Sequence, residues 1–177
     1  MQLKRVVVTG IGALTPIGNT ADEYWQGLIN GVSGAAPITR FDASKFKTQF
    51  ACEVKGFNPE DHFDRKEGRK HDLYSKFAMV ASSEAVADSG INGENADLGR
   101  IGVIWGSGIG GLETIYEGSL TINEKGPRKL SPFFIPSSLV NLLSGQISIK
   151  YGFKGPNHSV VTACATGAHS IGDASEM

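Results

Sequence analysis

The sequence has 177 residues, enough for one domain with a hydrophobic core, and 40% of its residues are apolar. A formal net charge of −1 at pH 7, without a long like-charged tail, argues against nucleic acid as a partner. The two cysteines, Cys52 and Cys164, form neither a metal-binding spacing nor a disulfide framework, so we expect no metal and a reducing, cytoplasmic setting. No apolar run is long enough to predict a membrane span.

The expected elements alternate between strands and helices along the chain. Strands are predicted at 5–9, 100–105 and 159–163, the first being a core strand rather than a signal peptide. Helices are predicted from Thr20 to Gly31 and at 75–89, 112–120 and 137–149, with loops at 33–58 and 124–136. This alternation predicts an α/β fold with a largely parallel sheet. The helix after Cys164 reaches Met177 without a stop signal, so we expect a fragment cut inside a helix.

Cys164 lies where a β-branched, mostly apolar segment turns into a helix-compatible run, in the stretch HSVVTACATGAHSI. Unpaired backbone N–H groups and the positive end of the helix dipole favour a thiolate at such a turn, as an activated nucleophile requires. A small core residue packed under the sheet is the alternative. The position alone leaves both interpretations open.

Glycines follow the strands predicted at 5–9 and 100–105, and only those after the second strand have the spacing of a known binding motif. Gly106, Gly108 and Gly111 match the dinucleotide-binding spacing G-x-G-x-x-G. A dinucleotide site would next need a second strand ending in an acidic residue, and a proline-rich loop occupies that region instead. We therefore expect close backbone packing around a tunnel or strand rather than nucleotide binding, and no cofactor.

The histidines are poorly spaced as partners for Cys164. His169 is five residues along the helix and points away, at about 100° per residue. His158 lies six residues back on an extended segment, on the order of 20 Å away. His62 and His71 belong to a charged surface segment. Any histidine partner would therefore come from residues outside this chain.

That charged segment carries the basic residues Arg65, Lys66, Arg69 and Lys70, interleaved with Asp64, Glu67 and Asp72. Arg128 and Lys129 form a second basic pair. Either set is explained by a solvated face or by docking of an acidic protein or a phosphate.

Five segments together resemble one family over the whole chain. They are RVVVTGIGALTPIGN, DRKEGRKHD, GSGIGGLE, GPRKLSPFFIPSSLVN and VVTACATGAHSIG. The sequence resembles the β-ketoacyl-acyl carrier protein synthases, the condensing enzymes of fatty-acid synthesis, and within them the type II enzyme. The resemblance implies a thiolase-like fold, in which two α/β halves form five layers (αβαβα) and pair into a homodimer. Residues 1–177 would be the N-terminal half, and the C-terminal half would be absent.

The resemblance also implies a mechanism and a set of site residues. Cys164 would take an acyl chain from acyl carrier protein as a thioester, and its backbone N–H would be one oxyanion-hole donor. Malonyl-carrier protein would then lose carbon dioxide and attack the acyl group in a Claisen condensation. The family's two histidines, lysine and phenylalanine would lie beyond Met177, so 177 residues alone are expected to be inactive.

The resemblance also assigns roles to further residues of this chain, position by position. Ile109 would line the acyl pocket, which Phe134 would reach from the partner subunit. Lys66, Arg69 and Lys70 would form the carrier-protein docking patch, and Arg128 and Lys129 its extension across the dimer. A non-catalytic acyl-binding subunit, similar to a chain-length factor, is the alternative function. Such subunits typically lose the cysteine that this chain retains.

Overall fold

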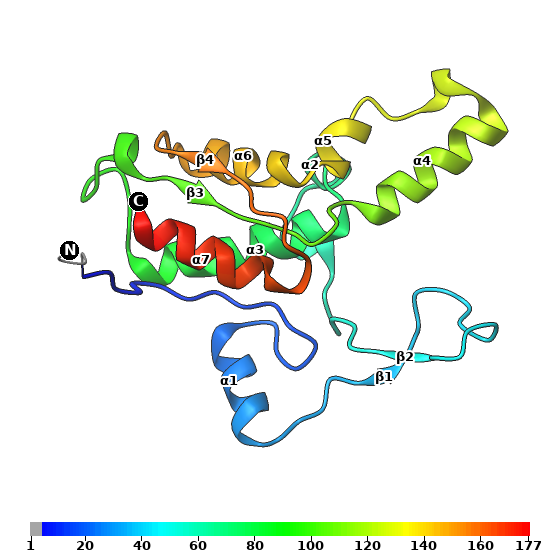
Figure 1. Cartoon of the computed structure of the whole chain (residues 1–177), viewed down its shortest axis with the longest axis horizontal. Helices are drawn as coiled ribbons and strands as arrows, with labels where there is room; N and C mark the ends of the chain where they lie inside the picture. Colours follow the sequence, from blue (N-terminus) through cyan, green and yellow to red (C-terminus); the bar gives the residue numbers. More distant parts are fainter. Residues whose placement is uncertain (1–4) are drawn as a thin grey trace. The chain divides into compact units, whose positions relative to one another are not determined.

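The computed structural model describes residues 5–177, which divide into two compact units (Figure 1). The larger unit comprises Glu60–Met79 and Ile91–Met177, with the described residues up to Val7. The smaller unit comprises Val8–Pro59 and Val80–Gly90. Each unit is described separately below.

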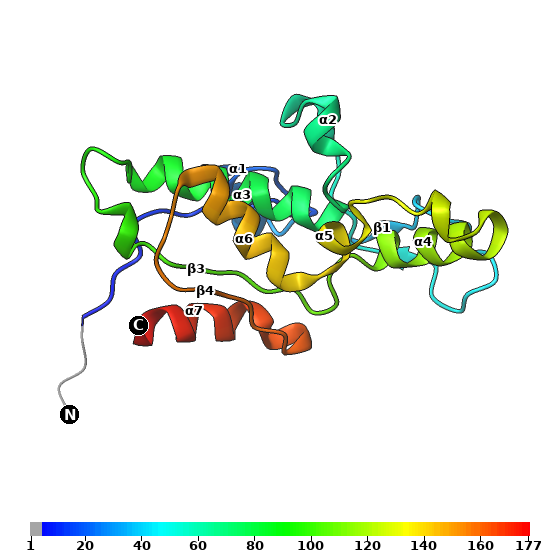
Figure 2. The same cartoon turned by 90° about the horizontal axis from the view of Figure 1, so that it is seen from above.

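A short parallel sheet lies at the centre of the larger unit. Strand β3 (Val103–Ile104) pairs in parallel with β4 (Asn157–His158), with Val103 opposite Asn157. Helices α6 (Val140–Tyr151) and α7 (Thr166–Glu176) lie on opposite faces of this pair (Figure 2). A parallel pair with helices on both faces confirms the predicted α/β class.

The strand predicted at 159–163 is wrong in position. The paired residues are Asn157 and His158, and Val161 is 55% exposed. The Asn157 side chain explains the shift, because its amide nitrogen donates to the Ser144 carbonyl (3.0 Å) and to the Ser148 hydroxyl (2.7 Å) on α6. These hydrogen bonds fix the start of the paired strand two residues earlier than predicted.

Three further helices of the larger unit follow the predictions with changed boundaries: α3 (Leu73–Ser89, which continues into the smaller unit), α4 (Leu112–Lys125) and α5 (Phe134–Ser138). Helix α2 (Arg65–Gly68), in the charged segment, was not predicted. The helix predicted at 137–149 is split into α5 and α6, because Leu139 is extended. The Ser138 carbonyl accepts from the Gly111 N–H (3.0 Å), and the Leu139 carbonyl accepts from the Tyr74 hydroxyl (3.0 Å). Partners outside the helix thus stabilise the break.

In the smaller unit, helix α1 (Ala21–Ile29) begins as predicted, since the Thr20 hydroxyl accepts from the Glu23 N–H at 3.2 Å. The Glu23 carboxylate accepts in return from the Asn19 N–H (2.7 Å), one residue earlier than a capping box requires. Gly31 then ends the helix with a φ of +65°. Strands β1 (Ala36–Pro37) and β2 (Phe50–Ala51) form an antiparallel pair.

The core strand predicted at 5–9 is not present among the described residues. Val6, Val7 and Val8 are 57%, 61% and 78% exposed. Instead of pairing with a strand, the following Ile11 and Ala13 N–H groups donate to carboxylates of α3. Across residues 5–177, no helix combines the length and the apolar character needed to cross a bilayer.

Candidate active site

Cys164 lies in a 3₁₀ turn, Ala163–Ala165, directly before α7. Ala163 has a φ of +49° and is the one non-glycine residue with positive φ within the described chain. A left-handed alanine costs about 1–2 kcal/mol, so the surrounding structure must hold this bend. Cys164 is exposed rather than packed in a core. The position of Cys164 at the start of a helix is as predicted, and its exposure favours the nucleophile over the packed core residue, which the sequence left open.

Two threonines hold this turn. The Thr162 N–H donates to Thr166 Oγ1 (2.9 Å), which in turn donates to the Ala163 carbonyl (2.8 Å). Thr166 is only 4% exposed. Thr162 Oγ1 lies 2.7 Å from His169 Nδ1. The sequence analysis did not single out either threonine, although both lie two residues from Cys164.

The histidines that were tested as partners make their contacts elsewhere. His169 meets Thr162, and His158 Nε2 lies 3.8 Å from Asp173 Oδ2. His71 is buried, unlike the predicted surface histidine, and its Nε2 lies 3.2 Å from Glu67 Oε1. None of these three contacts brings a histidine to the Cys164 thiol.

The glycine-rich turn after β3 packs against the Cys164 turn. A Cβ at Gly106 would lie 2.2 Å from the Val160 carbonyl oxygen and 2.3 Å from Thr166 Cγ2. A Cβ at Gly111 would lie 2.4 Å from the Ser137 carbonyl oxygen. Protein backbone therefore occupies the space that side chains would need. The glycine spacing serves close packing, as predicted, and gives no support to nucleotide binding.

The two predicted acyl-pocket residues lie in different surroundings within the described part of the chain. Ile109 is 66% exposed at the glycine-rich turn. The Phe134 ring packs on α4, where a Cβ at Gly118 would lie 2.4 Å from Phe134 Cε2. Phe134 lines a cavity of about 550 Å³ whose lining does not include Ile109.

The basic segment around α2 is held by acidic side chains. The Asp64 carboxylate accepts from the Glu67 and Lys66 N–H groups, both at 2.8 Å, and these bonds hold the pKa of Asp64 below its ordinary value. The hydrogen bond from Lys70 at 2.6 Å, followed by that from His71, lowers the pKa of Glu67. Lys66 is exposed, while Lys70 is engaged by Glu67.

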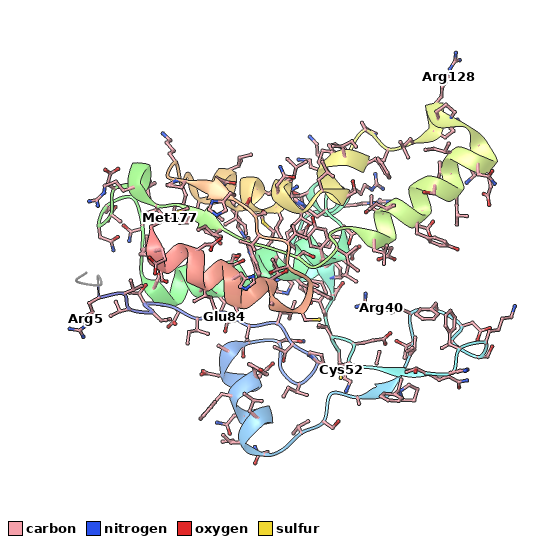
Figure 3. All side chains as sticks on the ribbon, viewed as in Figure 1. Arg5, Arg40, Cys52, Glu84, Arg128 and Met177 are labelled. Atoms are coloured by element: carbon pink, nitrogen blue, oxygen red, sulfur yellow. The ribbon has the colours of Figure 1, made fainter. Side chains whose placement is uncertain are left out.

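The second basic pair lies on a 3₁₀ turn, η3 (Pro127–Lys129), which packs against α4. Arg128 points outward from this turn (Figure 3). Lys129 lines the same cavity of about 550 Å³ as Arg69 and Phe134. The structure therefore brings one residue of each basic set to a single cavity within one chain.

Asp72 is a buried carboxylate in this region that the sequence analysis treated only as part of the charge run. Its Oδ2 accepts from the Thr114 N–H (2.9 Å) and hydroxyl (2.6 Å) in the first turn of α4. Ser137 donates its hydroxyl to the Lys70 carbonyl (2.7 Å). The backbone that follows α2 is thus fixed to both α4 and α5.

Comparison with protein families gives a match over residues 3–177 to the model described as "Beta-ketoacyl synthase, N-terminal domain". The chain belongs to the β-ketoacyl synthase family. The family predicted from the sequence is therefore confirmed.

Curated relatives of this β-ketoacyl synthase chain carry the name 3-oxoacyl-(acyl-carrier-protein) synthase 2. The Coxiella burnetii protein is 49% identical over 177 residues, which are 100% of this chain and 43% of that protein. The Vibrio cholerae protein is 48% identical, again over 100% of this chain and 43% of that protein. The Staphylococcus aureus protein is 48% identical over 98% of this chain and 42% of that protein. The chain thus spans less than half the length of these relatives.

Solved ketosynthase structures share the fold over 98% of this chain. The ishigamide ketosynthase/chain length factor has a TM-score of 0.82 at 29% identity, with 45% of that chain covered. A β-ketoacyl synthase from Burkholderia phymatum gives 0.78 at 28% identity, with 43% covered. A ketosynthase in complex with its type II acyl-carrier protein gives 0.79 at 25% identity, with 46% covered. The predicted α/β, thiolase-like fold class is therefore confirmed.

Proposed function

We propose that the protein containing this chain is a cytoplasmic β-ketoacyl-acyl carrier protein synthase II, an acyltransferase of fatty-acid chain elongation. In this proposal residues 1–177 are the N-terminal half of a two-half enzyme that works as a homodimer. The observation that carries the proposal is an exposed cysteine on a strained turn before a helix, in a chain of the β-ketoacyl synthase family. The name shared by relatives at 48–49% identity supports the type II assignment.

In the first step, the Cys164 thiolate attacks the carbonyl carbon of the acyl thioester on acyl carrier protein. The new C–S bond forms at Cys164 as the carrier's C–S bond breaks, and the carrier leaves as a thiol after gaining a proton. The Cys164 N–H donates to the oxyanion of the tetrahedral intermediate, a donation typically worth about 3 kcal/mol.

In the second step, malonyl-carrier protein loses carbon dioxide, and the electron pair of the broken C–C bond forms an enolate. The enolate carbon attacks the acyl-Cys164 thioester, a new C–C bond forms, and Cys164 leaves as a thiolate. The product is a β-ketoacyl group on the carrier. No cofactor is needed, because decarboxylation drives the bond formation.

Two basic surfaces would receive the acidic carrier protein. Lys66, Arg69 and Lys70 form the docking patch on and beside α2, and Arg128 and Lys129 extend it. The exposure of four of these side chains supports this role, whereas Lys70 would have to exchange its bond with Glu67 for a carrier carboxylate. The related ketosynthase structure that contains an acyl-carrier protein supports a partner of this kind.

Ile109 and Phe134 would line the acyl pocket. The exposure of Ile109 on the glycine-rich turn suits a residue that meets an acyl chain. Phe134 would act on the pocket of the partner subunit, because in its own chain it packs on α4 rather than beside Ile109.

The test is the mass of the intact protein after incubation with a medium-chain acyl-acyl carrier protein. We expect the mass of one acyl group to be added to the wild type and to be missing from Cys164→Ala. An unmodified, folded wild-type protein would instead favour a non-catalytic partner subunit similar to a chain-length factor. An adduct that persists in Cys164→Ala would refute the assignment of the nucleophile.

A further inference from the structure

The hydroxyl of Thr166 makes two hydrogen bonds to the backbone beside Cys164. It accepts from the Thr162 N–H at 2.9 Å and donates to the Ala163 carbonyl at 2.8 Å. A hydroxyl can do both at once, which a methyl group cannot. The Ala163 carbonyl also accepts from the Thr166 backbone N–H. Thr166 therefore spans the bend formed by Ala163 at a φ of +49°.

The Ala163 carbonyl and the Cys164 N–H belong to one planar peptide unit. Fixing the direction of the carbonyl therefore fixes the direction of the N–H on its other side. If the carbonyl rotates, the N–H rotates with it. The two hydrogen bonds of Thr166 thus act on the group that the proposed function uses as an oxyanion donor.

We propose that Thr166 is a positioning residue that aims the Cys164 N–H at the developing oxyanion, an inference that rests on the proposed function. Thr166 does not touch substrate in this role, because it is 4% exposed and sits beneath the turn. It acts through the peptide unit between Ala163 and Cys164.

Gly106 places the Thr166 side chain. A Cβ at Gly106 would lie 2.3 Å from Thr166 Cγ2 and 2.2 Å from the Val160 carbonyl oxygen. The methyl group of Thr166 therefore packs against the backbone of Gly106, where a side chain would not fit. With the methyl group on that side, the hydroxyl faces the Thr162 N–H and the Ala163 carbonyl. The first glycine of the G-x-G-x-x-G spacing thus supports the nucleophile rather than a nucleotide.

The experiment compares Thr166→Val and Thr166→Ser in the intact protein. Valine keeps both branches at Cβ and loses the hydroxyl, whereas serine keeps the hydroxyl and loses the methyl. We expect Thr166→Val to slow acylation of Cys164 by about tenfold or more, since small misplacements of reacting groups can cost about 100-fold. Thr166→Ser should stay within about threefold of wild type. The carrier concentration for half-maximal acylation should not change, because Thr166 is not on the docking surface.

Alkylation of Cys164 by iodoacetamide separates this role from a general structural one. Alkylation forms no oxyanion, so Thr166→Val should alkylate at a rate within about threefold of wild type while acylation falls. Peptide mapping by mass spectrometry distinguishes Cys164 from the other exposed cysteine, Cys52. Unchanged acylation in Thr166→Val, or an equal fall of acylation and alkylation, would overturn the proposal.

A second variant and a hydrogen-exchange measurement test the proposal even if Thr166→Val does not fold. If Thr166→Val does not fold, Thr166→Ala removes the same hydroxyl without the branched side chain, and the same two rates apply to it. In the wild type, the Thr162 amide should exchange slowly with solvent, and exchange at the rate of an unprotected amide would overturn the proposal. A Cys164→Ala protein that still accepts an acyl group would refute the proposed function instead.

Discussion

Glu84 on α3 holds two separate backbone segments of the smaller unit, and its replacement by glutamine gives a measurable loss of stability. One carboxylate oxygen accepts from the Ala13 N–H and the other from the Ala21 N–H, both at 2.8 Å. A glutamine amide has only one oxygen, so one of these N–H groups would face an NH₂ group. Leaving a donor unsatisfied costs about 1–3 kcal/mol, and the remaining bond loses its charge assistance, about 1 kcal/mol more. Because Glu84 is only half-buried, we expect a loss near the lower end, about 2 kcal/mol.

Urea denaturation of the intact protein measures this loss, and hydrogen exchange locates it. In Glu84→Gln, the amides of Ala13 and Ala21 should lose protection by about 30-fold, the ratio that about 2 kcal/mol represents. Asp88→Asn keeps an oxygen for the single exposed hydrogen bond from the Ile11 N–H and loses only the charge assistance of that bond, so it should lose less. Glu94→Gln, at an exposed loop position, serves as the control and should change stability by less than about 0.5 kcal/mol. If Glu84→Gln matched Glu94→Gln in both measurements, the reasoning would be refuted.

Three other predictions use the same intact protein. Gly118→Ala should destabilise the protein by about 1–3 kcal/mol in spite of the better helix propensity of alanine, because its Cβ would meet an aromatic ring at 2.4 Å. A Cβ at Gly145 would meet nothing within 4 Å, so Gly145→Ala should stabilise the protein by up to about 1 kcal/mol. Equal shifts of the melting temperature in Gly118→Ala and Gly145→Ala would contradict this prediction. Arg69→Glu should raise the carrier concentration for half-maximal acylation about tenfold at low salt, while Lys47→Glu, also exposed, should leave it unchanged. Glu67→Gln should cost about 0.2–1 kcal/mol at neutral pH, and this difference should vanish in acid. The hydrogen bonds lower the pKa of Glu67 from 4.5, so its stabilisation is complete above that pH and is lost as the pH falls through the lowered value, which melting curves against pH will measure.

Two helix limits, the start of α1 and the end of α3, were predictable because their signals are local. Thr20 accepts from an N–H three residues away, and Gly90 ends α3 with a φ of +66°, so neighbouring residues alone determine both ends. The strands depend on partners far away in the sequence. The pairing at Asn157 is fixed by serines of α6, and periodicity within the strand carries no information about them.

The candidate site also combines features set by neighbouring residues, which were predictable, with features set by residues far away in the sequence, which were not. The turn at Cys164 was predictable from the change of pattern around it, but the left-handed Ala163 was not, because alanine gives no signal for positive φ. Thr166 is an ordinary residue in the sequence, and its role depends on how Gly106 packs against it from a distant segment. The family resemblance supplied Ile109 and Phe134, and their exposure and packing could be learned only from the structure.

The most direct test of condensation at Cys164 is the mass of the carrier-bound products formed by the intact protein from acyl- and malonyl-acyl carrier protein. We expect a β-ketoacyl carrier whose chain is two carbons longer than the starting acyl group, with release of carbon dioxide, and none of this product from Cys164→Ala. A wild-type protein that takes up the acyl group but forms no longer chain would contradict the proposed condensation. Equal product from Cys164→Ala would contradict the central place of Cys164.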